Sequence, residues 1–188
     1  MGVLTRKSGG LNPVFITSKA DARLAARRVA WGKVHNCGQI CLSPDYVMLD
    51  ARVEAAFVDG FAQALAGFYP AGSAADKNSY GRIVNDRHFQ RIAGLLQRSA
   101  GTVKVGGKSD AGERWIEPTL VKLDSLHDAL LSEEIFGPVL PYYVVSGGVD
   151  EMLAMVRTVG DCPLALYVFS NDKREQEYSG FSSTRRKR

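Results

Sequence analysis

Cysteine is scarce in this sequence of 188 residues, which contains three cysteines and three scattered histidines. Three cysteines make a poor disulfide framework, so we expect a reducing, cytoplasmic setting. Cys37 and Cys41 lie close together, but no second pair of cysteines or histidines follows at the spacing of a zinc site. The third cysteine, Cys162, is distant in sequence. We therefore expect neither a disulfide scaffold nor a bound metal.

Long apolar runs and the common nucleotide-binding motifs are missing as well. No stretch approaches the ~20 apolar residues of a membrane span, and the N-terminus lacks the apolar core of a secretory signal. Neither G-x-G-x-x-G nor G-x-x-x-x-G-K-[ST] occurs, and Ser-His-Asp chemistry lacks a nucleophile elbow. We expect no membrane span and no nucleotide-binding domain of either common type.

The net charge of +4 says little about function, because the excess positive charge lies at the C-terminus. Residues 185–188 are all arginine or lysine and supply these charges, so the rest of the chain is close to neutral. A short basic run at a terminus is typical of a solvated tail. We expect no nucleic-acid partner.

Hydrophobic periodicity predicts strands that alternate with helices about once per 30 residues. This alternation favours a single α/β domain with a largely parallel sheet flanked by helices. The pattern predicts helices near residues 20–34, 53–68, 85–97, 150–156 and from 172 onward, and strands at 13–17, 46–49, 102–105, 115–123, 142–145 and 164–169.

Two of the three cysteines lie in residues 35–44, here named the cysteine loop, between a predicted helix and a predicted strand. A cysteine on a surface loop can meet a substrate, and its thiolate is the nucleophilic form. Free cysteine is also among the most buried residue types, so both Cys37 and Cys41 could be packing residues. Spacing and composition alone leave both interpretations open.

Two motifs resemble the aldehyde dehydrogenase family. The run N-C-G-Q-I-C at 36–41 resembles its N-x-G-Q-x-C signature, and E-E-I-F-G-P at 133–138 matches a second family motif without a mismatch. Further stretches resemble the class 3, fatty-aldehyde-like branch: G-R-I-V-N at 81–85, I-E-P-T at 116–119 and P-L-A-L-Y-V-F-S at 163–170. The similarity runs from about residue 9 to about residue 172.

The resemblance implies NAD⁺- or NADP⁺-dependent oxidation of an aldehyde, of medium or long chain or aromatic, to a carboxylic acid. Cys41, the last residue of the signature, would be the catalytic nucleophile that forms a thiohemiacetal and then a thioester. Its backbone N–H would form part of the oxyanion hole. Glu134 would bind the nicotinamide ribose, and Phe136 would pack near the nicotinamide. Cys37 falls at a variable position and is expected to pack.

The sequence also departs from the family pattern. The resemblance divides the chain into a divergent segment 1–12, an incomplete catalytic domain 13–178 and a basic tail 179–188, with the N-terminal Rossmann-type cofactor domain absent. The family's E-L-G-G-K motif should fall at 7–11, but Lys7 replaces the general-base glutamate and Leu11 replaces the lysine. A lysine with its ordinary pKa of about 10.4 is protonated at neutral pH and cannot activate water.

Two hypotheses follow from these matches and departures. The first is an aldehyde dehydrogenase by descent, with an aldehyde substrate and NAD or NADP as cofactor. The second is a non-catalytic fragment that keeps the catalytic-domain fold and at most binds a partner, such as a full-length relative or a second copy. In either case we expect the 188-residue chain alone to be inactive or severely impaired.

Overall fold

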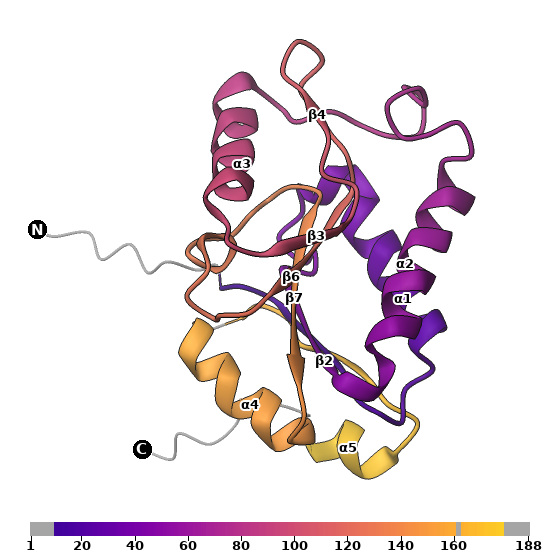
Figure 1. The fold of residues 1–188 in the computed structure, drawn as a ribbon, viewed down its shortest axis with the longest axis vertical. Coiled ribbons are helices and arrows are strands. Elements are labelled where there is room, and N and C mark those ends of the chain that lie inside the picture. The colour runs from indigo at the N-terminus through magenta and orange to yellow at the C-terminus, as the bar shows by residue number, and fades with distance from the viewer. Residues whose placement is uncertain (1–9, 161–162, 179–188) are drawn as a thin grey trace, which may run out of the picture.

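The structure is a computed structural model that describes residues 10–160 and 163–178 (Figure 1). Lys7, Cys162 and the basic tail 179–188 therefore lie outside the described residues. The helices are α1 (Ala22–Val34), α2 (Glu54–Phe68), α3 (Asp86–Arg98), α4 (Gly148–Val159) and α5 (Lys173–Tyr178). The strands are β1 (Pro13–Ile16), β2 (Tyr46–Asp50), β3 (Thr102–Val105), β4 (Ser109–Asp110), β5 (Trp115–Ile116), β6 (Thr119–Leu123), β7 (Val139–Val145) and β8 (Tyr167–Phe169).

Six strands form the main sheet, in the order β3-β6-β7-β2-β1-β8. All neighbouring pairs are parallel except β3 and β6, which run antiparallel. The predicted α/β class with a mostly parallel sheet is therefore confirmed. A separate antiparallel pair, β4 and β5, forms a small hairpin that the sequence pattern did not predict.

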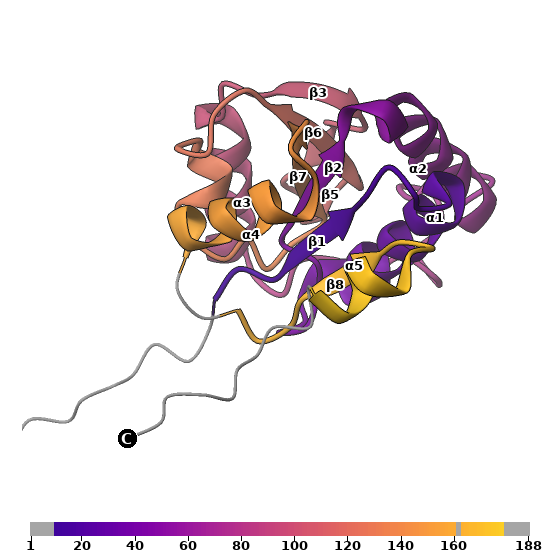
Figure 2. The same cartoon turned by 90° about the horizontal axis from the view of Figure 1, so that it is seen from below.

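Helices cover both faces of the sheet, as a mostly parallel sheet requires. Helices α1 and α2 lie on one face, and α3 and α4 lie on the other (Figure 2). Side chains of β1 alternate between the two layers: Val14 and Ile16 pack with α1 and α2, whereas Phe15 packs with residues of α3 and α4. The two hydrophobic cores therefore meet at the sheet.

Side chains at helix starts account for the observed boundaries of α1 and α3. Asp21 and Asn85 precede these helices, and each side-chain oxygen accepts a backbone N–H of the first turn, from Leu24 and His88 respectively. These caps lie within two residues of the predicted starts of both helices. Strand β7 begins three residues earlier than predicted, because Pro141 lies inside it, opposite Val121 of β6.

Membrane insertion through a helix finds no support in the described part of the chain. None of its helices is both long and apolar enough to cross a bilayer.

Candidate active site

The cysteine loop begins where α1 ends and leads into β2. Residues His35–Gly38 form a short 3₁₀ turn, in which Asn36 and Cys37 adopt left-handed backbone angles with φ of 48° and 55°. Two consecutive non-glycine residues in this region are unusual and are kept there only by surrounding contacts. The loop is therefore a defined structure that the surrounding protein maintains.

The two cysteines of the loop have opposite environments. Cys37 is buried, and its thiol lies within hydrogen-bonding reach of Tyr80. Burial raises the pKa of the Cys37 thiol to about 11, so the thiolate is rare at neutral pH. Cys41 is exposed. Of these two thiols, only that of Cys41 is accessible to a reactant.

The two motifs quoted above meet in space at a pair of glycines. Gly38 has a φ of +71°, and a Cβ atom on it would lie 2.3 Å from the carbonyl oxygen of Gly137. A Cβ on Gly137 would in turn lie 2.6 Å from Ile92 of α3. At Gly38 no other residue type fits without movement of the backbone, whereas at Gly137 the Ile92 side chain would have to move. The cysteine loop is thus packed directly on the segment that carries Glu134 and Phe136.

Gln39 joins the loop to a third stretch, residues 81–85. Its side-chain amide donates to the carbonyl of Arg82 at 3.1 Å and accepts the backbone N–H of Val84 at 2.9 Å. The same amide donates to the carbonyl of Asn36 at 3.1 Å. The Gln39 side chain therefore stabilises the turn within the loop and links the loop to residues 81–85.

The structure places Glu134 and Phe136 beside the loop with different surroundings. Glu134 is half-buried, and burial together with nearby Asp45 raises the pKa of its carboxyl group. Among the described residues, no group donates a hydrogen bond to this carboxylate. Phe136 is 38% exposed and has a left-handed φ of 49°. An acceptor carboxylate and an aromatic ring are thus both open to a bound molecule.

Sequence reasoning missed two buried polar residues beneath the loop, Asn12 and Lys33. The Asn12 amide donates to the carbonyls of Cys41 at 2.8 Å and Ser43 at 3.1 Å. The Lys33 ammonium donates to the carbonyl of Pro44 at 2.8 Å. Lys33 falls on the buried face of α1, in register with alanines and valines, and this position was the available signal.

Burial lowers the pKa of Lys33 to about 8, even though the neighbouring Asp45 and Glu134 carboxylates oppose this effect. Burial likewise raises the pKa of Asp45. Buried charges are costly unless they are paired and hydrogen-bonded. The carboxylates and the ammonium therefore form one electrostatically connected group under the loop.

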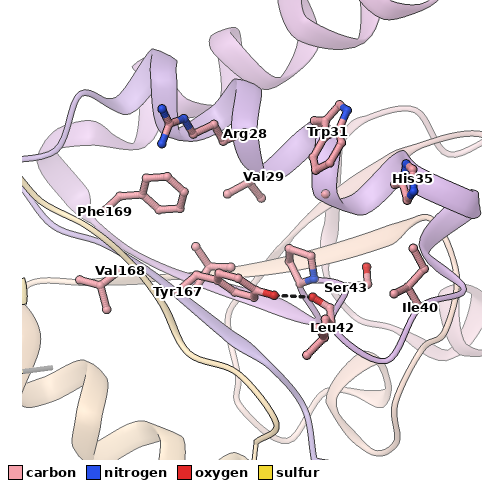
Figure 3. Close-up of a pocket in the computed structure, with 13 residues that line it drawn as sticks. Arg28, Val29, Trp31, His35, Ile40, Leu42, Ser43, Tyr167, Val168 and Phe169 are labelled. Carbon is pink, nitrogen blue, oxygen red and sulfur yellow. Dashed lines mark hydrogen bonds between the residues drawn. The ribbon is translucent and has the colours of Figure 1, made fainter. Parts of the chain in front are cut away.

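A cavity of about 560 Å³ opens between α1, the cysteine loop and β8 (Figure 3). Most of its lining is apolar, and Trp31 and Leu42 in its wall are 60% and 51% exposed. Tyr167 of β8 lies on the side of the cavity opposite α1 and donates its hydroxyl to the carbonyl of Leu42 at 2.6 Å (Figure 3). Ile40 and Leu42, the two neighbours of Cys41, both line this cavity.

Fold and site together define a class of protein: a mostly parallel α/β domain with an exposed thiol on a loop beside an apolar cavity and an open carboxylate. The family model described as "Aldehyde dehydrogenase family" matches residues 3–180. The chain belongs to the aldehyde dehydrogenase family, as its motifs predicted.

Individual relatives agree with this assignment. The chain is 44% identical over 167 residues to a beta-apo-4'-carotenal oxygenase of Neurospora crassa, covering 89% of this chain and 31% of that protein. It is 41% identical over 172 residues to the dimeric NADP-preferring aldehyde dehydrogenase of Canis lupus familiaris, covering 90% of this chain and 37% of that protein.

A solved structure gives the same result for the fold. The structure titled as the substrate-bound state of Staphylococcus aureus AldH superimposes with a TM-score of 0.85 at 35% identity, over 90% of this chain and 36% of that chain. The chain thus spans about a third of the length of these relatives.

Proposed function

We propose that residues 13–178 act as the catalytic-domain part of an NAD(P)⁺-dependent aldehyde dehydrogenase, with Cys41 as its nucleophile. The observation that carries this proposal is the contact between Gly38 and Gly137, which packs the loop of an exposed thiol against the motif of Glu134 and Phe136. The family membership and the identities of about 40% to named aldehyde dehydrogenases support the same reaction.

Each step of the reaction has a role for a residue of the loop. The Cys41 thiolate attacks the aldehyde carbon, and a C–S bond forms while the carbonyl oxygen becomes an oxyanion. Within the described residues the Cys41 N–H has no acceptor, which suits a donor for this oxyanion. A bound NAD(P)⁺ would supply the hydride acceptor for oxidation of this adduct, and water would then hydrolyse the thioester on Cys41 to release the carboxylic acid and the free thiol.

The residues present fit the cofactor end of this site. Glu134 offers a carboxylate without a donor among the described residues, and a pair of ribose hydroxyls supplies such donors. Phe136 offers a partly exposed ring on the same segment, one residue beyond buried Ile135. Glu134 would bind the ribose hydroxyls and Phe136 would pack on the nicotinamide. Whether NAD⁺ or NADP⁺ is preferred depends on contacts beyond these two side chains.

The cavity whose lining includes Ile40 and Leu42, but not Cys41 itself, supports an apolar aldehyde. Its lining is mostly hydrocarbon and includes the large side chains of Trp31, Ile40 and Leu42, which offer dispersion contacts and no compensation for a buried polar group. A volume of about 560 Å³ is sufficient for a medium-chain or aromatic group. We infer that the hydrocarbon part of a medium-chain, long-chain or aromatic aldehyde lies here.

A second candidate function, a non-catalytic binding module, is favoured by one observation. By the motif resemblance, Lys7 occupies the position of the general-base glutamate. A protonated lysine cannot accept a proton from water. We therefore expect negligible NAD(P)⁺-dependent turnover from the 188-residue chain alone, with reversible aldehyde addition at Cys41 retained.

Protection of Cys41 from alkylation tests the proposal directly. Decanal should slow iodoacetamide labelling of Cys41, read by peptide mass spectrometry, whereas decane of equal chain length should not protect. Labelling of Cys41 that decanal does not slow would overturn the proposed nucleophile. Reduction of NAD⁺ by the purified chain with decanal at an ordinary enzymatic rate would overturn the expected inactivity.

A further inference from the structure

Asn12 makes a complete set of hydrogen bonds beneath the nucleophile. Its side chain is fully buried, and both amide hydrogens are used, in the bonds to the carbonyls of Cys41 and Ser43. Its amide oxygen accepts the backbone N–H of Ala165 at 2.9 Å. Rotating the amide by 180° would place oxygen against two carbonyl oxygens, so the bonded network fixes the orientation.

The backbone of Asn12 makes two hydrogen bonds to Asp45, the residue that immediately precedes β2. Its N–H donates to the Asp45 carboxylate at 2.8 Å, and its carbonyl accepts the N–H of Asp45 at 2.9 Å. Strand β1 starts at the next residue and pairs in parallel register with β2. Asn12 is therefore bonded to the residue before β2 at the point where the β1–β2 pairing begins, and it links the groups that it holds to the sheet.

From these contacts we propose that Asn12 is a positioning residue for Cys41, an inference that rests on the proposed role of Cys41 as nucleophile. By holding the carbonyls of Cys41 and Ser43, Asn12 fixes the backbone on the C-terminal side of the thiol. Because the Cys41 carbonyl carbon is bonded to the Cα that bears the thiol side chain, fixing this carbonyl restricts the directions in which the thiol can point. Lys33, bonded to Pro44, holds the next carbonyl along the loop.

The requirement is for an amide at position 12. Aspartate has the same shape and keeps an oxygen for the N–H of Ala165, but it places its second oxygen against two carbonyls. Alanine leaves two carbonyls and one N–H without partners. At low pH the carboxyl group introduced by Asn12→Asp would be protonated and would regain one O–H donor for these carbonyls. The effect of this substitution should therefore depend on pH.

The test compares the wild-type chain with Asn12→Asp and Asn12→Ala, using the dissociation constant of decanal from Cys41. At pH 8 we expect Asn12→Asp to weaken decanal binding about tenfold and Asn12→Ala about fivefold, with samples held well below their Tm. At pH 5.5 the dissociation constant of Asn12→Asp should be less than threefold above that of wild type. The dissociation constant of Asn12→Ala should stay about fivefold above that of wild type.

Three outcomes separate the two proposals. If wild type does not bind decanal at Cys41, the proposed nucleophile is wrong. If wild type binds decanal and both variants bind it equally well, only the role of Asn12 is overturned. A loss of binding in Asn12→Asp that acid does not relieve also overturns it, because the proposal attributes this loss to the ionised carboxyl group that faces the two carbonyl oxygens.

A measurement on the wild-type chain keeps the inference testable if both variants fail to fold. The side-chain amide protons of Asn12 should exchange slowly with solvent, and their NMR signals should shift when decanal adds to Cys41. Rapid exchange of these protons, or signals that do not respond to formation of the adduct, would overturn the positioning role.

Discussion

The first half of the cysteine loop, residues 36–39, and the second half, residues 41–44, are held in place by different means. In the first half, backbone packs against backbone at Gly38, Cys37 is buried beside Tyr80, and the half-buried Gln39 amide donates to the carbonyl of Arg82. In the second half, the buried side chains of Asn12 and Lys33 donate hydrogen bonds to the carbonyl groups of residues 41, 43 and 44. The first half thus carries the buried thiol of Cys37, which packs, and the second half carries the exposed thiol of Cys41, the proposed nucleophile.

The largest expected effect is a loss of stability on packing the first half too tightly. Gly38→Ala places a Cβ at 2.3 Å from the Gly137 carbonyl oxygen and also requires a left-handed alanine. The strain and the overpacking together should lower the free energy of unfolding by about 4 kcal/mol. Denaturant titration followed by circular dichroism measures this change.

Gly148 provides a matched control for Gly38. It has the same φ of +71°, but a Cβ on it would meet nothing within 4 Å. Gly148→Ala should therefore cost only the left-handed strain, about 1 kcal/mol. Equal losses in the two variants would mean that the contact between Gly38 and Gly137 contributes nothing beyond backbone strain.

A pH-dependent effect of intermediate size should arise in the second half, at Lys33. The pKa of Lys33 is about 8 in the folded protein and near 10.5 when unfolded, so the unfolded chain binds more protons between these values. The contribution of Lys33 to the free energy of unfolding should therefore rise with pH between about 8 and 10.5, and it should be lowest below pH 8. Between pH 7 and pH 10 the gain should be on the order of 2 kcal/mol.

Comparison with Lys33→Met isolates this effect from the other groups that titrate at alkaline pH. The difference in unfolding free energy, wild type minus Lys33→Met, should increase from pH 7 to pH 10. Arg28→Met, at an exposed position of the same helix, should show no such increase. A difference that stays flat or falls with pH would show that Lys33 keeps an ordinary pKa in the folded protein.

Gly38 and Lys33 also mark how far the sequence predicts the structure. The helices were located within a few residues because the spacing of their apolar residues is a local signal. Strand β7 was predicted too short because proline is rare inside an interior strand, and Pro141 suggested a later start. The packing of Gly38 on Gly137 joins segments about a hundred residues apart, so no local pattern specifies it.

The candidate site divides in the same way. Cys41, Glu134 and Phe136 come from motif resemblance, and the structure brings their segments together. Asn12 and Lys33 lie outside the motifs that the sequence analysis identified. A buried polar side chain can be recognised as such only when the positions of its hydrogen-bond partners are known. Their roles follow from hydrogen bonds to carbonyl groups, which every residue possesses and no sequence pattern records.

The smallest effect on stability, and the clearest difference in reactivity, concerns the two thiols themselves. Cys37→Ser exchanges a buried thiol for a more polar hydroxyl and should cost about 1 kcal/mol, whereas Cys41→Ser at an exposed position should change stability by less than about 0.5 kcal/mol.

Iodoacetamide at pH 8 should label Cys41 at least tenfold faster than Cys37, because burial shields Cys37 and keeps its pKa near 11. Peptide mapping over time measures both rates, and faster labelling of Cys37, or of Cys162 outside the described residues, would contradict the assignment of Cys41 as the reactive thiol. Loss of this difference in Gly38→Ala, but not in Gly148→Ala, would connect the selectivity to the packed half of the loop.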